Sequence, residues 1–397
     1  MKPARPIYLD HAATTPTDPR VVEAMLPYFA EIYGNPSSAH SFGRKAEGAI
    51  ETARERLAQL LNCSRTEIVF TSCGTESDNM ALRGVAMQAL SMGKRAHIFT
   101  TQAEHHAVSH TAEQLARLNL ARLTWLTPEA DGSLTPQTLE TALSGLTPEE
   151  VGLVSVMYAN NEIGTIQPIA ALAEVAHAHG ALFHTDSVQA AGQLSLDVQA
   201  LGVDMLALSA HKFYGPKGVG LLYMRRGVSL FSAQTGGSQE NSHRAGTHNV
   251  PLIVGMARAL ELAYEDLPVR VANYTRLRDR LIDGVLDSVE GAQLTGAEKG
   301  RRLPNHASFA FKGIEANALL MHLDLSGIAA SSGSACNTGN PKPSDVLLSV
   351  GLAPDLALGS LRLTVGRQTT DDDISYVLTT LPTAVERLRA VRLAHHL

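Results

Sequence analysis

The sequence lacks the features that mark membrane and secreted proteins. No apolar run approaches the roughly 18 residues that a transmembrane helix needs. Residues 1–7 contain no apolar stretch of the kind found in secretory signals. Cysteine is scarce, with only Cys63, Cys73 and Cys336, and so small and odd a number predicts reduced thiols instead of disulfides. We therefore expect a cytoplasmic protein without a membrane partner.

The usual signals of nucleotide and nucleic-acid binding are also missing. The formal net charge of −6 argues against nucleic acid as the main partner. A dinucleotide-binding oxidoreductase would need G-x-G-x-x-G after its first strand, and the sequence has none there. It also has no G-x-x-x-x-G-K-[ST] phosphate loop, no internal repeat and no low-complexity segment.

What is present is an alternation of strands and helices. The 397 residues are 44% hydrophobic and 18% charged, an ordinary globular composition, and they are enough for two domains. The alternation predicts a mostly parallel sheet with helices on both faces, which binds ligands at the carboxyl ends of its strands. The predicted strands are 67–71, 96–100, 122–126, 151–158, 181–185 and 203–208, and the predicted helices are 19–32, 44–61, 78–88, 111–118 and 168–179.

A long, largely apolar helix over 251–267 leads into a second predicted domain. Its elements are helices 273–289 and 316–325, a strand at 308–311 and a closing segment, 360–367. Thr370 and Asp373 form the pattern of a capping box at the start of a last helix. Asp18 and Pro19 are the matching start signal for the first helix of the chain.

Lys212 follows a buried strand and precedes a glycine-rich turn, within the stretch 206–220. A lysine at such a place is partly desolvated, so its pKa falls and its amine can attack a carbonyl to form a Schiff base. The alternative is a surface lysine in a strand-to-loop turn, and this stretch alone does not decide between them.

Asp186 ends the strand 181–185, about one βαβ unit before Lys212, and Gln189 follows it. The acid and the lysine can therefore lie at neighbouring strand ends. An acid beside a Schiff-base lysine suits a pyridinium cofactor, whose ring nitrogen the carboxylate keeps protonated. Alternatively, Asp186 caps the next helix.

The turn Ser72–Thr75 lies between a predicted strand and the start of a helix. Backbone N–H groups and the helix dipole make such a turn a phosphate site. An ordinary capped helix start has the same pattern, so this motif also leaves two readings open.

Three further side chains lie at or near strand ends. His105 can stack on a flat cofactor and shuttle protons near pH 7, while His106 and His110 have the spacing of a metal pair without a third ligand. Asn161 can bond a cofactor oxygen, although asparagine is also common in turns. Arg362 can clamp a carboxylate with its planar fork, or lie on a solvated strand face.

Cys336 lies in a small-residue segment, Ser331-Ser-Gly-Ser-Ala-Cys, without bulky apolar neighbours. This composition predicts a mobile loop with an exposed nucleophile, not an inert core cysteine. Taken together, the lysine, the acid, the phosphate-type turn and this thiol predict a pyridoxal phosphate (PLP) enzyme that acts on an amino acid.

Over nearly its whole length the chain resembles the NifS/IscS-type cysteine desulfurases, which are class V aminotransferase-like enzymes. The shared motifs are Tyr8-Leu-Asp-His-Ala-Ala-Thr-Thr, Gly34-Asn-Pro-Ser-Ser, Phe70-Thr-Ser-Cys-Gly-Thr-Glu-Ser, Glu104-His105, Asn160-Asn-Glu-Ile-Gly, His184-Thr-Asp-Ser-Val-Gln, Ser209-Ala-His-Lys, Arg244-Ala-Gly-Thr and Ser331-Ser-Gly-Ser-Ala-Cys. Cys73 and the short segment after Arg367 are more similar to the NifS branch. Asn241-Ser242 departs from the family, which usually has Arg-Gly there.

The resemblance implies the α/β fold of aminotransferase-like PLP enzymes (fold type I). A large PLP-binding domain over residues 15–262 would contain a mostly parallel seven-stranded sheet. A smaller α+β domain would combine residues 1–14 and 263–397 and carry the Cys336 loop.

It also implies an activity and a set of roles. L-cysteine becomes L-alanine in a homodimer, and a persulfide is left on Cys336 for an acceptor such as an iron–sulfur scaffold protein. Lys212 forms the Schiff base and moves protons, His105 stacks on the ring and serves in proton transfer, and Cys336 attacks the substrate sulfur. The implied cofactor-binding residues are Gly74, Thr75, Asn161, Asp186, Gln189, Ser209, His211, Lys212 and, from the partner subunit, Thr247, and the implied substrate-binding residues are Asn161 and Arg362.

Two other interpretations remain. Another PLP enzyme of the same fold, such as a selenocysteine lyase or an aminotransferase, shares Lys212 and Asp186 but does not need Cys336. A catalytically silent sulfur carrier or scaffold would keep the fold without the cofactor, so a visible absorption spectrum separates it from both enzymes.

Overall fold

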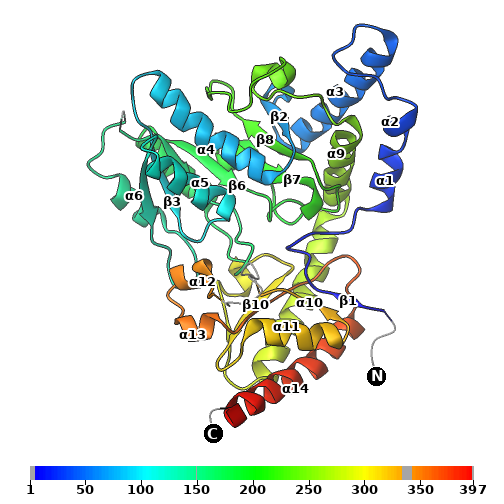
Figure 1. The fold of residues 1–397 in the computed structure, drawn as a ribbon, viewed down its shortest axis with the longest axis vertical. Helices are drawn as coiled ribbons and strands as arrows, with labels where there is room; N and C mark the ends of the chain where they lie inside the picture. The colour runs from blue at the N-terminus through cyan, green and yellow to red at the C-terminus, as the bar shows by residue number, and fades with distance from the viewer. Residues whose placement is uncertain (1–4, 149, 333–341, 396–397) are drawn as a thin grey trace.

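The structure is a computed structural model that describes residues 5–148, 150–332 and 342–395, the last four by their backbone alone (Figure 1). Within these residues, seven strands form the central sheet in the order β2-β8-β7-β6-β5-β3-β4. The strands are β2 Ile68–Thr71, β3 His97–Thr101, β4 Arg122–Leu126, β5 Leu153–Ser155, β6 Leu182–Asp186, β7 Met205–Ser209 and β8 Gly220–Met224. Only β8 among them runs antiparallel to its neighbours, β2 and β7. The expected mostly parallel sheet is confirmed.

Helices cover both faces of this sheet, as the alternating pattern predicts. On one face, α4 Gly74–Ser91 and α5 His106–Arg117 pack over side chains such as Val69 and Leu222 (Figure 1). The opposite face carries Phe70 and Leu221 in a larger apolar core. The helices that contribute to that core are α1 Pro19–Met25, α3 Ser41–Leu61, α6 Pro136–Leu143, α7 Ile169–Ala178, α8 Val198–Leu201 and α9 Val250–Glu265. Because both faces are buried at the centre of the sheet, strands such as β7 and β8 are largely apolar on both sides.

A second core lies in the lower half of Figure 1. It is built on the antiparallel sheet β12-β10-β9, with β9 Ala292–Leu294, β10 His306–Phe311 and β12 Ser360–Thr364. Beside it, β1 Ile7–Tyr8 pairs in parallel with β11 Ile328–Ala329, so the N-terminal segment lies with the C-terminal part of the chain. The helices of this part are α10 Leu267–Ser288, α11 Ala316–Leu325, α12 Asp345–Ser349, α13 Pro354–Ala357 and α14 Asp371–His395. The domain boundaries at residues 15 and 263 stay a prediction.

Several local signals in the sequence are confirmed. Asp18 accepts a hydrogen bond from the backbone N–H of Arg20 and caps α1, with Pro19 at its first position. Thr370 and Asp373 form a reciprocal capping box, because each side chain accepts a hydrogen bond from the other's backbone N–H. None of the helices in the described ranges combines the length and the apolar character needed to cross a bilayer.

The helix predicted over 19–32 is wrong as a single element. The helix α1 ends at Met25, and a separate short helix, α2 Pro27–Ala30, follows it. Pro27 causes the break, since it has no N–H to donate into the preceding turn and its ring clashes with a helix that continues.

Other predicted bounds are wrong where helices begin in polar residues. The start predicted at 111 is observed at His106, where the isolated apolar pair Ala107-Val108 is too short to show a period. The start predicted at 78 is observed at Gly74, because the first turn of α4 carries no apolar residues and periodicity appears only later. For the same reason α6 was not predicted. The strand β8 was missed because a short apolar run next to a glycine-rich turn has no periodicity of its own.

Four short 3-10 helices complete the described chain: η1 Arg65–Glu67, η2 Ala210–Lys212, η3 Gln239–Ser242 and η4 Lys299–Arg301. The third is unusual, because Glu240, Asn241 and Ser242 have φ of 47°, 53° and 67° in succession. This left-handed region costs a residue with a Cβ roughly 1–2 kcal/mol. Part of the strain falls on Asn241-Ser242, the pair that departs from the motifs of the resemblance described above.

Ser242→Gly is therefore expected to stabilise the protein by about 0.5–1 kcal/mol, because relief of the strain exceeds the extra chain entropy of glycine. Ser238→Gly is the matched control, an exposed serine of the same segment at φ −87°, and should destabilise by about 0.5–1 kcal/mol. Urea unfolding midpoints of the two variants measure the difference. Equal shifts would contradict the strained backbone at residue 242.

Candidate active site

The carboxyl ends of β6 and β7 adjoin a cavity of about 300 Å³. The two strands are parallel neighbours, with Asp186 opposite Ala207. Asp186 is the last residue of β6, and Lys212 ends η2, which follows β7 directly. Both side chains line the cavity, together with the predicted site residues Gly74, Thr75, His105, Asn161, Gln189, Ser209, His211 and Arg362.

Lys212 is directed into this cavity and is not a surface lysine. Its Nζ donates to the backbone carbonyls of Ala12 at 2.6 Å and Ala13 at 2.9 Å. Burial, and then the positive charge of Arg362, lower the pKa of Lys212 to about 8. A larger share of the amine is therefore neutral near pH 8 than in an ordinary lysine, which makes it a better nucleophile.

Asp186 faces the same cavity from the neighbouring strand. Its Oδ1 accepts a hydrogen bond from the N–H of Val188 at 2.9 Å. The chain over 187–197 forms turns without a helix, so the interpretation of Asp186 as a helix cap is wrong. Burial raises the pKa of Asp186, while the charges of His105 and Lys212 oppose this change.

The turn before α4 forms another wall of the cavity. Cys73 is the N-cap residue of α4, and Gly74 begins the helix. A Cβ added to Gly74 would come within 2.8 Å of Cγ2 of Val188, so glycine allows the helix start to pack this closely against Val188. The start of this eighteen-residue helix, Gly74 and Thr75, lines the cavity, and helices bind phosphate at such N-terminal N–H groups.

His211 and His105 both lie at the cavity as neutral rings. Burial lowers the pKa of His211 to about 4, with further lowering by Lys212 and Lys217. Burial also lowers the pKa of His105. Its Nδ1 accepts from the N–H of Ala107 at 3.1 Å, so the ring proton lies on Nε2.

Arg362 enters the cavity from β12. It is only 5% exposed, so the interpretation of Arg362 as a residue on a solvated strand face is wrong. Its guanidinium donates to the backbone carbonyl of Asn161 and to Oδ1 of Asp10, both at 2.8 Å. Its Nε is buried without a hydrogen-bond partner among the described residues, which leaves a donor for a ligand.

With this geometry in view, we compared the chain with known proteins. The family model "Aminotransferase class-V" matches residues 7–377. The chain belongs to the class-V aminotransferase family. The cysteine desulfurase IscS of Dictyoglomus turgidum is 45% identical to it over 387 residues, which are 98% of this chain and 96% of the relative. A cysteine desulfurase of Trichormus azollae is also 45% identical, over 97% of this chain and 94% of its own length.

Solved structures of the class-V family agree with this result. A NifS-like protein has a TM-score of 0.88 and 36% identity, and the match covers 96% of this chain and all (100%) of that one. The structure titled "SspA in complex with cysteine" has a TM-score of 0.78 and 34% identity, with 90% of this chain and 98% of that one covered. The expected fold and family are confirmed. Placement nearer the NifS branch stays a prediction, because relatives named IscS and structures named NifS-like both match.

Class-V aminotransferases, the cysteine desulfurases among them, use PLP. The chemical groups that line the cavity suit this cofactor. A buried amine at Lys212, a buried carboxylate at Asp186 and the helix start at Gly74 correspond to its aldehyde, its ring nitrogen and its phosphate.

Two carboxylates of the site were not predicted. Asp10 pairs with Arg362 across most of the length of the chain. Asp78 is buried, and its Oδ1 lies 3.5 Å from Nε2 of His184. Burial and the charge of Asp186 raise the pKa of Asp78 well above its usual range. The polar segment around Asp10 was a sequence signal for a nearby site, but Asp78 looked like an ordinary first residue of a helix.

Three predicted features are not among the described residues that line this cavity. Thr247 is exposed and does not line this cavity. Cys336 and the loop expected around it lie outside the described residues. The rings of His106 and His110 stack with centroids 4.2 Å apart, and the described residues contain no group of three metal-ligating side chains.

Proposed function

We propose that this protein is a cysteine desulfurase that uses PLP. The observation that carries the proposal is the meeting of Lys212, Asp186 and Arg362 in one cavity, since it joins a nucleophilic amine, an acid for a pyridinium nitrogen and a clamp for a carboxylate. The 45% identity to cysteine desulfurases over nearly the whole chain supports the same choice.

PLP, when bound, acts as an electron sink for the bonds around the substrate Cα. The protein's own groups handle the protons. The Lys212 amine takes and returns the proton at Cα, and Asp186 keeps the cofactor's ring nitrogen protonated. Gln189, whose Nε2 donates to the carbonyl of Ala12, lies beside them, and we assign it to the cofactor's phenolic oxygen. The neutral ring of His105 would hold the face of the cofactor ring, and it carries the proton on Nε2 that it could supply there.

The remaining predicted residues would hold the carboxylate of the substrate and the phosphate of the cofactor. Arg362 and Asn161 bind the substrate carboxylate, with the free Nε of Arg362 as one donor. Thr75 at the start of α4, Ser209 at the end of β7 and His211 in η2 would hold the phosphate, where the N–H groups of α4 would add to their side chains. The substrate is thereby fixed at one side of the cavity, and its sulfur is left for the attacking thiol.

The sulfur step needs the thiol of Cys336. The thiolate attacks the sulfur of bound cysteine, the Cβ–S bond breaks and an S–S bond forms. The substrate Cβ takes a proton and becomes the methyl group of L-alanine, and the persulfide remains on Cys336. The described chain supports this placement, because Ser331 forms backbone hydrogen bonds with Arg362 just before the segment that carries Cys336.

We further propose a homodimer in which Thr247 completes the phosphate site of the other subunit. Thr247 is exposed and away from its own cavity, which suits a role across an interface. An apolar patch of Leu26, Phe29, Tyr33 and Phe42, each at least half exposed, offers a surface for a second copy.

The dimer predicts complementation between two inactive variants. Lys212→Ala and Thr247→Ala protein, mixed under conditions that exchange subunits, should regain about a quarter of the wild-type sites, because half the dimers then hold one intact site. Sedimentation velocity of the wild type should give a dimer. A fully active monomer would rule the proposal out.

The persulfide then passes to an acceptor protein, for which an iron–sulfur scaffold in the cytoplasm is our proposal. Incubation with L-cysteine and a thiol reductant tests the core of the function, and alanine and sulfide should appear in equal amounts. Formation of alanine from L-selenocysteine alone would favour a selenocysteine lyase, and keto-acid formation without sulfide would favour an aminotransferase. Absence of a visible cofactor spectrum would favour a silent carrier.

A further inference from the structure

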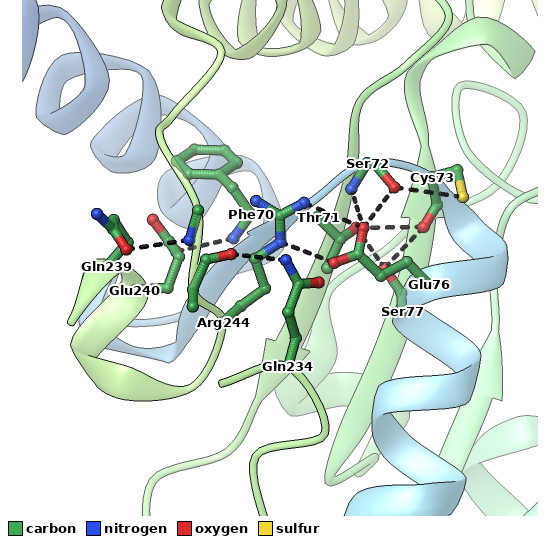
Figure 2. Close-up of polar contacts among 12 residues, drawn as sticks. Phe70, Thr71, Ser72, Cys73, Glu76, Ser77, Gln234, Gln239, Glu240 and Arg244 are labelled. Atoms are coloured by element: carbon green, nitrogen blue, oxygen red, sulfur yellow. Dashed lines mark hydrogen bonds and ion pairs between the residues drawn. The ribbon is translucent and has the colours of Figure 1, made fainter. Parts of the chain in front are cut away.

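The turn Ser72–Thr75 is held by a residue pair that has no part in the assignments above. Figure 2 shows Glu76, in the first turn of α4, with its carboxylate directed back at Ser72 and outward at Arg244. Its Oε2 accepts from the N–H of Ser72 at 2.6 Å and from the Ser72 hydroxyl. Arg244 donates through Nε to Oε1 at 2.7 Å and through a terminal nitrogen to Oε2 at 3.3 Å.

Arg244 reaches this carboxylate from a segment that is itself fixed. Glu240 accepts from the N–H of Phe70, from both terminal nitrogens of Arg54 and from Nε2 of His248. Phe70 belongs to β2, which leads directly into the turn. The segment that contains Glu240 and Arg244 therefore forms hydrogen bonds with the chain just before the turn, at Phe70, and just after it, at Glu76 (Figure 2).

The charge of Glu76 matters because the turn faces a phosphate site. Burial opposes ionisation of Glu76, but hydrogen bonds from Arg244 and Ser72 outweigh it and lower its pKa. An ionised carboxylate one helical turn from a phosphate repels it, and the repulsion persists in a half-buried place. Arg244 both orients this carboxylate and cancels its charge.

We propose that Glu76 and Arg244 are positioning residues for phosphate binding. Glu76 holds Ser72 so that the N–H groups of Gly74 and Thr75 stay directed at the cavity, and Arg244 keeps Glu76 in place and neutralised. The turn is closed from the other side by β8, where a Cβ on Gly220 would lie 2.6 Å from the carbonyl carbon of Cys73. The pair thus acts on the phosphate through the turn without touching the reacting atoms. This inference rests on PLP as the cofactor.

Two substitutions separate this role from a merely structural one by the sign of their effects. Arg244→Met leaves the Glu76 charge beside the phosphate, so the dissociation constant of the cofactor-free protein for PLP should rise about ten-fold. Glu76→Gln keeps the shape of the carboxylate and its bond from Ser72 but removes its charge, so PLP should bind as tightly as before or more tightly. The double variant should regain most of the affinity lost in Arg244→Met.

The readout is fluorescence titration of cofactor-free protein with PLP and with pyridoxal, which lacks the phosphate, together with the thermal shift caused by inorganic phosphate. Pyridoxal affinity should change less than about three-fold in every variant. Arg258→Met is the matched control, since Arg258 pairs with Glu261 on α9 at similar exposure. If the pair has only a structural role, all three variants should bind both PLP and pyridoxal more weakly, or their affinities should not change. Either result overturns the inference. If wild-type protein binds no PLP, the proposed function fails instead.

Discussion

Lys212→Ala should lose the visible absorption of the bound cofactor and all measurable turnover of L-cysteine. The Nζ of Lys212 is the amine directed into the cavity, and its neighbours Ala12 and Ala13 offer only carbonyl oxygens. Among the described residues, no other lysine lines that cavity. Loss of a covalent catalytic group costs up to about 10⁶ in kcat, so the residual rate should fall below detection. Absorption spectra and alanine release measure the two effects separately.

Lys217→Ala is the control for this prediction, because Lys217 is exposed in the same glycine-rich turn. It should keep both the spectrum and the rate. The pH dependence adds a second check. Because the pKa of Lys212 is about 8, the neutral amine increases as pH rises through 8, and capture of PLP by the cofactor-free protein should accelerate in the same range. An unchanged spectrum in Lys212→Ala would show that another group holds the cofactor.

Cys336→Ala should keep the cofactor spectrum and still bind L-cysteine, yet release alanine and sulfide at least about 10³-fold more slowly, since it lacks the nucleophile of the sulfur step. Binding needs Lys212, Asp186 and Arg362, none of which contacts the substrate sulfur in our proposal. The spectral change on addition of L-cysteine measures binding, and mass spectrometry of the wild type should locate added sulfur on Cys336.

The other two cysteines are controls. Burial raises the pKa of Cys63 to about 12, so its thiol is inert at neutral pH and Cys63→Ala should not affect the rate. Cys73 lines the cavity, so Cys73→Ala tests whether a second thiol near the turn can carry the sulfur. Desulfuration by Cys336→Ala at the wild-type rate would refute the persulfide step and favour the selenocysteine lyase.

The part of the site that could be predicted from the sequence depends on neighbouring strands. Asp186 ends β6 and Lys212 comes shortly after β7, and parallel strands joined by one crossover place their ends side by side. Local signals such as the cap at Asp18 were equally visible, since their partners lie within a few residues.

What could not be predicted depends on contacts between distant segments. Asp10 and Arg362 form a pair across 352 residues, and no local pattern indicates it. Asp78 faces His184 only because α4 packs on the sheet at one particular rotation. In the central sheet the one antiparallel strand of the described residues, β8, was not predicted either, because its direction is decided by the turn after Lys212 and not by its composition.

The pairing of Asp10 with Arg362 has a consequence for biosynthesis. The N–H of Ala12 is also bonded to Oγ1 of Thr364, so the wall of the cavity beside Lys212 is built by joining the two ends of the chain. A ribosome adds roughly 5–20 residues per second, and the central sheet can form well before β12 emerges. Until β12 has docked, the nascent chain has no complete pocket to offer, so the PLP of our proposal can be bound only once this strand is in place.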